Sequence, residues 1–308
     1  MSALPRLVVV LGPTASGKST LGIRLAEKLG GEILVCDSTQ VYRHFDIGTA
    51  KVPAAEQHDI AHHLVDFCEP AEIFTAGDYR RRALDALDDL RRRKVLPILT
   101  AGTGLYLRAL LEGLADAPQR SEEIRARLRQ RAELRGPEHL HRVLARLDPQ
   151  SAARISSPDT QKIIRAIELR LLTGKPVGEI HRGGRDALQG YDVVKIGLLP
   201  PRAALYARIH ARTDAMLAAG WLEEVRGLVA SGVAADAKPF QFIGYSQLRE
   251  HLAGQLSKKD AVQQIQQATR RFAKRQITWF RKETGVHWLA SFGDAQEIFA
   301  AALVIVKS

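Results

Sequence analysis

A glycine-rich loop near the N-terminus constrains the fold of this chain more than any other feature. The apolar run Leu7–Leu11 is typical of a buried parallel strand. Apolar residues recur at helical spacing in Lys18–Leu29. Between them, Gly12–Ser19 has the sequence GPTASGKS, which fits the pattern G-x-x-x-x-G-K-[ST]. A strand, a glycine loop and a helix in this order predict a phosphate-binding loop in an α/β fold.

The predicted loop suits a diphosphate group that is accompanied by Mg²⁺. Its backbone N–H groups and the positive end of the following helix attract an anion. Lys18 adds a positive charge, and the Ser19 hydroxyl is the expected protein ligand of Mg²⁺. We therefore expect the diphosphate to contact the loop and the first helical residues, namely Gly12, Pro13, Thr14, Ala15, Ser16, Gly17, Lys18, Ser19 and Thr20.

The loop alone does not select ATP, because any diphosphate ester presents the same group. A usual P-loop kinase or ATPase also has an apolar strand that ends in an Asp for magnesium. The strand expected at Val95–Thr100 is followed by Ala101 and Gly102 instead. Asp37 does follow an apolar strand, but its early place in the chain fits contact with a second substrate equally well.

The strand and helix pattern predicts a core that an all-helical segment interrupts. Strands are expected at Glu32–Cys36, Val95–Thr100 and Val193–Leu199, and helices at Asp78–Arg93, Leu105–Leu111, Ala203–Ala219, Leu222–Ser231 and about Lys259 to Lys282. The interrupting helices are expected at Ser121–Arg135, Pro137–Leu147 and Thr160–Thr173, followed by a loop at Gly174–Gly190. We predict an α/β P-loop NTPase-like core, a parallel sheet flanked by helices, from 1–118 and 190–308, with a helical insertion domain at 119–189.

Charge and cysteine content narrow the class of protein. The net charge is +11, from 45 Lys and Arg against 34 Asp and Glu. A polyanionic partner such as nucleic acid explains this surplus, and a soluble enzyme from a basic proteome explains it equally well. The two cysteines, Cys36 and Cys68, provide no disulfide framework, and with His58, His62 and His63 they match no zinc pattern. No membrane or signal segment is expected, so we predict a cytoplasmic protein with no membrane partner.

The motifs, taken in order, resemble those of the tRNA dimethylallyltransferase (tRNA isopentenyltransferase, IPP transferase) family over nearly the whole chain. Two mild departures are Ala101, where many relatives have Gly, and Thr160–Lys162, near which an Arg is more usual. The matching segments are Gly12–Ser19, Asp37–Tyr42, Asp46–Lys51, His62–Asp66, Ala101–Tyr106, Arg165–Glu168, Arg212–Leu217, Gly220–Val225, Ile243–Tyr245 and Thr269–Arg281.

The resemblance implies transfer of a dimethylallyl group from dimethylallyl diphosphate to N6 of adenosine 37 in the tRNA anticodon stem-loop, with release of diphosphate. Asp37 would face the amine and Thr103 would lie beside it, while Lys18 and Arg212 would neutralise the diphosphate. Mg²⁺ would be the cofactor and the protein a monomer. The residues expected to contact tRNA are Asp37, Ser38, Thr39, Gln40, Thr103, Arg125, Gln161, Lys162, Ile163, Ile164, Arg165, Arg271, Arg275 and Lys282.

The chemistry supports these roles but leaves alternatives open. An exocyclic amine is a weak nucleophile, so a carboxylate that accepts its proton assists, although Asp37 could instead cap the next segment. From Arg270 to Lys282 the chain has six cations and no acid, which suits RNA phosphates. Core packing is the preferred role for Phe272 and Phe280. An ATP-dependent small-metabolite kinase and an RNA-binding NTPase switch are the competing functions.

Overall fold

The computed structural model describes residues 4–182 and 186–308. The chain forms two compact units: Met1–Leu110 together with Gln189–Ser308, and Leu111–Leu188. The second unit begins earlier in the chain than the insertion expected at 119–189. A backbone hydrogen bond of 3.0 Å from Leu188 N to Leu111 O joins the two ends of this unit.

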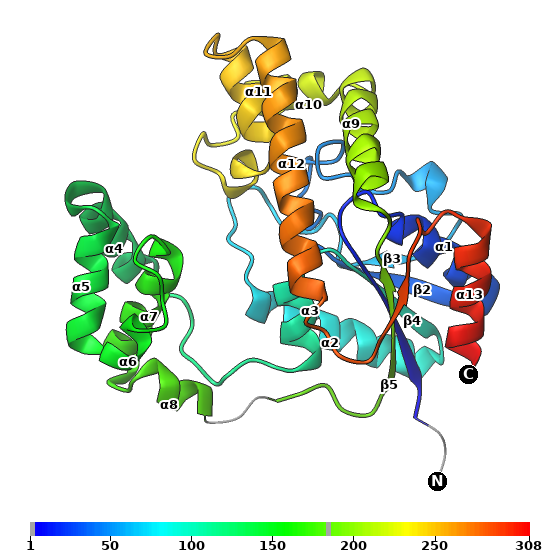
Figure 1. Cartoon of the computed structure of the whole chain (residues 1–308), viewed down its shortest axis with the longest axis horizontal. Helices are drawn as coiled ribbons and strands as arrows, with labels where there is room; N and C mark the ends of the chain where they lie inside the picture. The colour runs from blue at the N-terminus through cyan, green and yellow to red at the C-terminus, as the bar shows by residue number, and fades with distance from the viewer. Residues whose placement is uncertain (1–3, 183–185) are drawn as a thin grey trace. The chain divides into compact units, whose positions relative to one another are not determined.

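The first unit is built on a parallel sheet with the strand order β3-β2-β4-β1-β5-β6 (Figure 1). The strands are β1 (Arg6–Leu11), β2 (Gly31–Cys36), β3 (His62–His63), β4 (Leu96–Ala101), β5 (Asp192–Leu198) and β6 (Val286–Leu289). In register, Val8 of β1 lies between Ile98 of β4 and Val194 of β5. Every residue from Leu7 to Leu11 is fully buried, which confirms the expected buried parallel strand.

Helices pack against the sheet through side chains that alternate along each strand. Val8 and Val10 share a core with Leu21 of α1 (Lys18–Leu29) and Ile298 of α13 (Gln296–Lys307). Alternation points their neighbours to the opposite face. The helix α2 (Ala76–Arg93) and the helix α3 (Gly104–Leu111) stack Tyr79 on Tyr106 with ring centroids 4.6 Å apart. The expected α/β core with a parallel sheet flanked by helices is confirmed.

A helical layer follows β5 in the chain. It contains α9 (Arg202–Ala218), α10 (Trp221–Ala230), the short 3₁₀ helix η2 (Lys238–Gln241), α11 (Tyr245–Leu252) and α12 (Lys258–Phe280). Glu224 of α10 accepts hydrogen bonds from the backbone N–H groups of Asp46 (3.0 Å) and Ile47 (2.7 Å) and from the Tyr245 hydroxyl (2.6 Å). Three of the motifs found in the sequence therefore meet at one carboxylate, which fixes the loop before the other 3₁₀ helix, η1 (Ala54–Glu56).

The second unit is a separate helical bundle around its own apolar core. Its helices are α4 (Glu122–Arg135), α5 (Pro137–Leu147), α6 (Pro149–Ala152), α7 (Thr160–Thr173) and α8 (Val177–Arg182). The buried carboxylate of Glu168 accepts hydrogen bonds from Arg125 (2.9 and 2.8 Å), Arg165 (2.6 Å) and the Ser121 N–H (2.7 Å). Burial alone would raise the pKa of Glu168, but the two arginines outweigh it and lower this pKa to about 2.

The structure corrects three expectations about local structure. The chain after Leu199 is not entirely helical, because Val286–Leu289 pairs with β5 as strand β6. Part of the loop expected at Gly174–Gly190 is the helix α8, and residues 183–185 of that loop lie outside the described residues. The basic helix ends at Phe280, so Lys282 lies beyond it and does not continue its face.

We predict that Glu168→Gln destabilises the helical unit by about 3 kcal/mol, because it leaves Arg125, whose side chain is only 13% exposed, without its buried charged partner. Since folding lowers the pKa of Glu168, its contribution is full above the ordinary Glu pKa and is lost as the pH falls toward 2. Hydrogen exchange across Leu111–Leu188 measures the effect. The control is Glu123→Gln, whose partner Arg127 is exposed, with an expected cost below about 0.5 kcal/mol. Equal protection in the two variants would contradict the assignment.

Candidate active site

The phosphate-binding loop connects β1 to α1, as the sequence predicts. Its turn is closed by a hydrogen bond from Ser16 N to Pro13 O (3.2 Å), and Gly293 N supports it from behind by donating to Ser16 O (2.9 Å). The Ser16 hydroxyl is completely buried and has no hydrogen-bond partner among the described residues. A buried hydroxyl without a partner is costly, so the loop is built to receive a polar ligand.

Two cations lie at the phosphate-binding loop. Lys18 Nζ donates to Pro13 O (2.8 Å), and Arg212 of α9 donates from Nη1 to Thr14 Oγ1 (3.3 Å). Desolvation lowers the pKa of Lys18, the Asp37 carboxylate raises it and Arg212 lowers it, and the net result is a pKa of about 8. Burial also lowers the pKa of Arg212. An incoming anion would favour the charged form of both side chains.

Asp37 follows the last residue of β2, and its Oδ2 accepts no hydrogen bond from the residues that the structure describes. Its Oδ1 accepts hydrogen bonds from Thr39 N (2.8 Å) and Thr39 Oγ1 (2.7 Å). The capping alternative therefore describes one oxygen of this side chain. Oδ2 lies so close to Gly102 that a Cβ there would approach it to 2.6 Å, which requires glycine at this position. The orientation of Asp37 is fixed by Thr39, and Oδ2 remains available for a substrate proton.

Thr103 joins the ends of two neighbouring strands. Its Oγ1 accepts a hydrogen bond from Ser38 N (2.9 Å) and lies 3.3 Å from Ser38 Oγ. Its backbone N–H donates to Cys36 O (3.0 Å). Gln40, also expected at the acceptor side, donates from Nε2 to the carbonyls of Thr49 (3.1 Å) and Ala50 (3.2 Å). Thr103 is thus brought beside Asp37 as expected, and its hydroxyl holds the Asp37 segment in place.

Sequence reasoning missed Gln276, a buried glutamine of α12. Its Oε1 accepts from Thr14 N (2.8 Å), and its Nε2 donates to Gly102 O (2.7 Å). The signal in the sequence was weak, because one uncharged residue among six cations resembles a helix spacer. Nearby Cys36 is buried, and burial raises the pKa of its thiol to about 12, so it is not a nucleophile.

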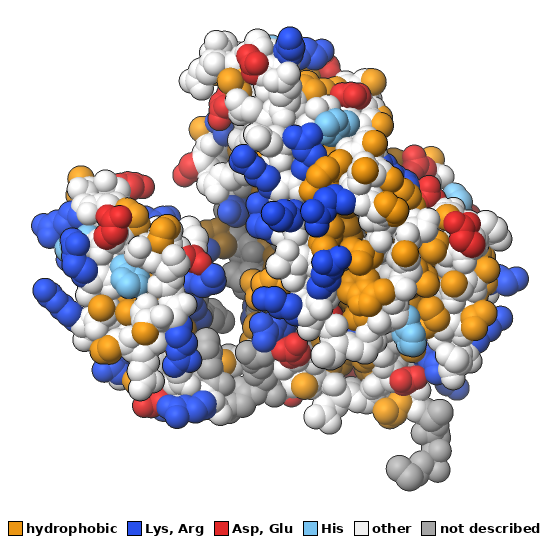
Figure 2. All heavy atoms as spheres, in the orientation of Figure 1, with side chains coloured by type: hydrophobic (Ala, Val, Ile, Leu, Met, Phe, Trp, Pro, Cys, Tyr) orange, Lys and Arg blue, Asp and Glu red, His pale blue; other side chains and the backbone are white. Residues whose placement is uncertain are grey.

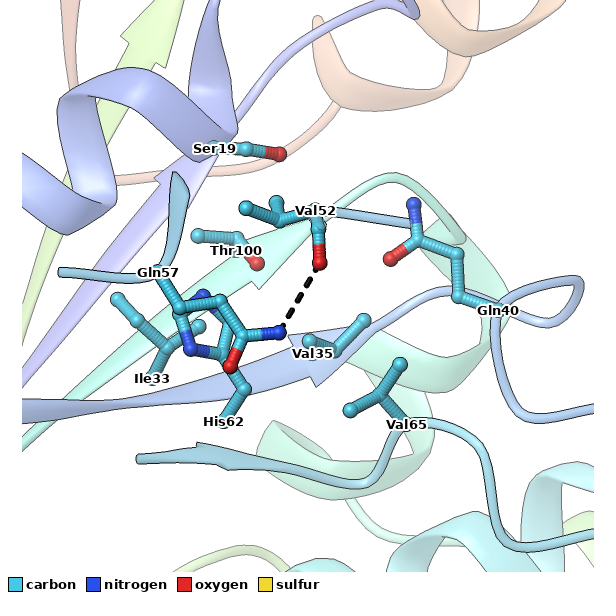
Figure 3. A pocket seen from close by; sticks show the side chains of 9 residues that line it. All are labelled: Ser19, Ile33, Val35, Gln40, Val52, Gln57, His62, Val65 and Thr100. Carbon is cyan, nitrogen blue, oxygen red and sulfur yellow. Dashed lines mark hydrogen bonds between the residues drawn. The ribbon is translucent and has the colours of Figure 1, made fainter. Parts of the chain in front are cut away.

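A small cavity extends from the phosphate-binding loop between α1 and the sheet (Figure 3). Ser19 and Thr100 bring their hydroxyls to it, and Gln57 donates to Val52 O across it (3.0 Å). Thr100 stands near the end of β4, where a P-loop ATPase would have an Asp. The described part of the chain has no group of three or more His, Cys, Asp or Glu side chains placed to hold a metal ion. The residues that line the cavity are Ser19, Ile33, Val35, Gln40, Val52, Gln57, His62, Val65 and Thr100.

The three histidines whose spacing matches no zinc pattern each contact a carboxylate or a backbone carbonyl of the protein. His58 contacts Glu27 (2.7 Å), and His63 contacts Glu32 (2.6 Å). His62 lies 2.8 Å from Ile60 O, and burial lowers its pKa. The expectation of structural roles agrees with these contacts.

Several residues expected to contact tRNA have other roles in the helical unit. Ile163 and Ile164 are 0% and 1% exposed, so the prediction that their side chains contact RNA is wrong; they pack in the core of the bundle. Arg125 is 13% exposed and pairs with buried Glu168, which gives it a structural role. Gln161 and Lys162 are exposed at the start of α7, and Arg165 is partly exposed. These three remain available to RNA.

The basic helix α12 presents its cations to solvent, and Figure 2 shows Lys and Arg side chains gathered over it. Arg271 and Arg275 are exposed on the helix, and Lys282 is exposed just beyond its end. Phe280 is buried, which confirms its expected core role, whereas Phe272 is only half-buried and lies under Arg275, 5.7 Å from the guanidinium carbon. None of the helices in the described residues is both long and apolar enough to cross a membrane.

The fold and the site together define an α/β protein whose first strand and helix are joined by a P-loop, and whose strand β4 lacks the terminal Asp of an ATPase. Comparison with known proteins identifies the family. The model of the IPP transferase family matches residues 40–283, and the chain belongs to this family.

Relatives match over nearly their whole length. The chain is 51% identical to a tRNA dimethylallyltransferase of Solibacter usitatus, over 96% of each chain. It is 49% identical to a tRNA dimethylallyltransferase of Koribacter versatilis, over 99% of each. Among solved structures, the tRNA isopentenylpyrophosphate transferase of Bacillus halodurans is 34% identical with a TM-score of 0.71, covering 98% of this chain and 97% of that one. A eukaryotic dimethylallyltransferase acting on tRNA is 27% identical with a TM-score of 0.82, covering 98% and 78%.

We predict that affinity for inorganic diphosphate falls as the pH rises through about 8. Lys18 is charged below this pKa and neutral above it, so the attraction to the anion is full at low pH and is lost at high pH. Calorimetric titration from pH 7 to 9.5 measures the decline. The control is Lys18→Arg, which stays charged throughout. Because diphosphate itself titrates in both experiments, the difference between the two proteins isolates Lys18; parallel curves would contradict the role.

Proposed function

We propose that the chain is a tRNA dimethylallyltransferase that moves a dimethylallyl group from dimethylallyl diphosphate to N6 of adenosine 37, next to the anticodon. Family membership and the names of its relatives, which are dimethylallyltransferases acting on tRNA, support the reaction class. The single observation that carries the proposal is the free Oδ2 of Asp37 beside a phosphate-binding loop whose cations respond to its charge. A proton acceptor and a site for the leaving group therefore lie close enough to interact electrostatically.

The leaving group is stabilised by the phosphate-binding loop. As the C1–O bond of the donor breaks, its electron pair passes to the diphosphate oxygen and charge grows on that group. Lys18, Arg212 and the backbone N–H groups at the start of α1 oppose this charge and so lower the barrier. The allylic C1 acquires cation character that the double bond delocalises, so no covalent enzyme intermediate is needed.

The acceptor nitrogen is activated by Asp37. N6 forms the new bond to C1, and one of its protons passes to Oδ2 of Asp37, while Oδ1 stays bound to Thr39. Thr103 keeps the Asp37 segment in register through Ser38. The adenine base of the tRNA must leave its stacked position to reach this site, and this unstacking costs little free energy in a single-stranded anticodon loop.

Magnesium fits the site as a companion of the diphosphate. Ser19 offers a hydroxyl ligand beside the loop, and diphosphate oxygens would supply further ligands, because the cavity next to Ser19 is lined by no carboxylate. The bound ion would add positive charge near the leaving group.

The kinase alternative is not favoured. The relatives are named as transferases acting on tRNA, and Thr100 occupies the place where a magnesium-binding Asp would be expected. A small-metabolite kinase would also have no use for the exposed cations of α12. We propose that the protein acts in the cytoplasm, as a monomer, on the anticodon stem-loop.

We predict that Asp37→Asn lowers the rate of prenyl transfer by about two to four orders of magnitude, since it removes the proton acceptor but keeps the volume. The Thr39 hydrogen bonds to Oδ1 can persist, so the fold should be unchanged. Transfer of labelled dimethylallyl to tRNA under single-turnover conditions measures the rate. Thr103→Ala, which removes one neutral hydrogen bond of about 1 kcal/mol, should cost much less. A rate for Asp37→Asn near that of wild type would refute the assignment.

We predict that replacing Arg271, Arg275 and Lys282 by Gln weakens tRNA binding and also flattens its dependence on salt. Each phosphate contact that is lost should reduce the slope of log affinity against log salt by about 0.7 to 0.9. Filter binding across a salt series measures this slope.

The matched control for this experiment replaces Lys28, Arg92 and Lys307, which are equally exposed but lie on α1, α2 and α13. It changes the net charge by the same amount, so its slope should stay at the wild-type value. Coincident slopes for the two triple variants would assign the effect to overall charge and move the RNA contacts to Gln161, Lys162 and Arg165.

A further inference from the structure

Gln276 is a buried polar residue in the basic helix, with 6% of its surface exposed. Its helical neighbours on the same buried face, Ala273, Ile277 and Phe280, are apolar. Burying an amide among them is costly unless both ends are hydrogen-bonded, and an apolar side chain would fill the space at less cost. Its two hydrogen bonds meet this condition, so their partners indicate what the residue does.

The two partners belong to the two halves of the site. Gln276 Oε1 accepts a hydrogen bond from the backbone N–H of Thr14 in the phosphate-binding loop. The hydroxyl of the same threonine accepts a hydrogen bond from Arg212. Nε2 donates to Gly102 O, directly before Thr103 and next to Asp37 Oδ2. One amide thus bridges two loops. The first is the phosphate-binding loop, which would hold the leaving diphosphate, and the second is the loop of Gly102 to Gly104, which borders the proposed position of the adenosine.

A second side chain of α12, that of Trp279, contacts the loop of Gly102 to Gly104 on the other side of Thr103. The indole of Trp279 lies against Gly104, where a Cβ would approach it to 2.2 Å. A side chain at Gly104 would therefore displace this indole, and the loop of Gly102 to Gly104 contacts α12 at both ends. The exposed face of this helix bears Arg271 and Arg275, so the same element links the RNA side of the proposed site to its interior.

We infer that Gln276 is a positioning residue that fixes the spacing between the phosphate-binding loop and the loop of Gly102 to Gly104, which lies beside Asp37. This inference rests on the proposed function, because the spacing matters only if a group passes between the two loops. The reacting carbon and nitrogen must be held close to bonding distance, and a misplacement of about 1 Å can reduce a rate by about 10²-fold. Gln276 contacts neither reactant in this scheme, so it acts through the two loops.

The first test is Gln276→Met, which keeps the length and volume of the side chain but removes both hydrogen bonds. We expect kcat for prenyl transfer to fall about 10²-fold while KM for tRNA stays close to wild type, because the exposed cations of α12 are untouched. Gln263→Met is the matched control, since Gln263 is exposed on the same helix. It should leave both constants unchanged.

The second test is Gln276→Glu, which separates positioning from a general loss of stability. A protonated carboxyl has one donor and one acceptor and can restore both hydrogen bonds, whereas a carboxylate would repel the Gly102 carbonyl. The ratio of its kcat to that of wild type should therefore rise as the pH is lowered from 8 to 6. Melting curves at each pH report the folded fraction.

A kcat for Gln276→Met close to that of wild type would overturn the inference. So would a loss of activity that follows the melting temperature and leaves kcat per folded molecule unchanged. So would a kcat ratio for Gln276→Glu that does not change with pH. Failure of the wild-type protein to prenylate tRNA in the same assay would instead refute the proposed function, and this inference with it.

Discussion

The parallel sheet brings the carboxyl ends of β1, β2 and β4 to one edge, and the whole proposed site depends on that arrangement. A single carbonyl, Cys36 O, accepts the N–H groups of both Gly102 and Thr103 at 3.0 Å and so ties the end of β4 to the end of β2. The phosphate-binding loop leaves β1, which pairs with β4 on one side and with β5 on the other. Without this register, Asp37 and Lys18 would not lie close enough for their charges to interact.

The site differs from that of an ATP-hydrolysing enzyme in where its acid lies. An Asp at the end of the strand next to β1 would bind magnesium, but Thr100 is near that end and Asp37 follows the next strand, β2. With Oδ1 held by Thr39, Oδ2 can face a second substrate, and we propose that the carboxylate acts there as a base rather than as a metal ligand. Moving one acid by one strand is enough to change the chemistry that the same fold supports.

Local patterns predicted most of the fold and the part of the site that lies in continuous motifs. The phosphate-binding loop, α1 and the helices α4, α5 and α7 of the second unit followed from apolar spacing, glycines and prolines. Strand β6 could not be predicted, because Val286–Leu289 is short and only partly buried, and its pairing with β5 is long-range. Ile163 and Ile164 were misassigned because a motif does not say which of its residues face inward. Gln276 was missed for a related reason, since its two partners are distant in sequence.

Nucleoside analysis of tRNA tests the central claim most directly. Unmodified tRNA is incubated with the protein, Mg²⁺ and either dimethylallyl diphosphate or ATP, then digested and analysed by mass spectrometry. We expect one adenosine per susceptible tRNA, at position 37, to bear a dimethylallyl group on N6. This product should form only when the prenyl donor is present. Unmodified adenosine with the prenyl donor, or a phosphorylated product that requires ATP, would contradict it.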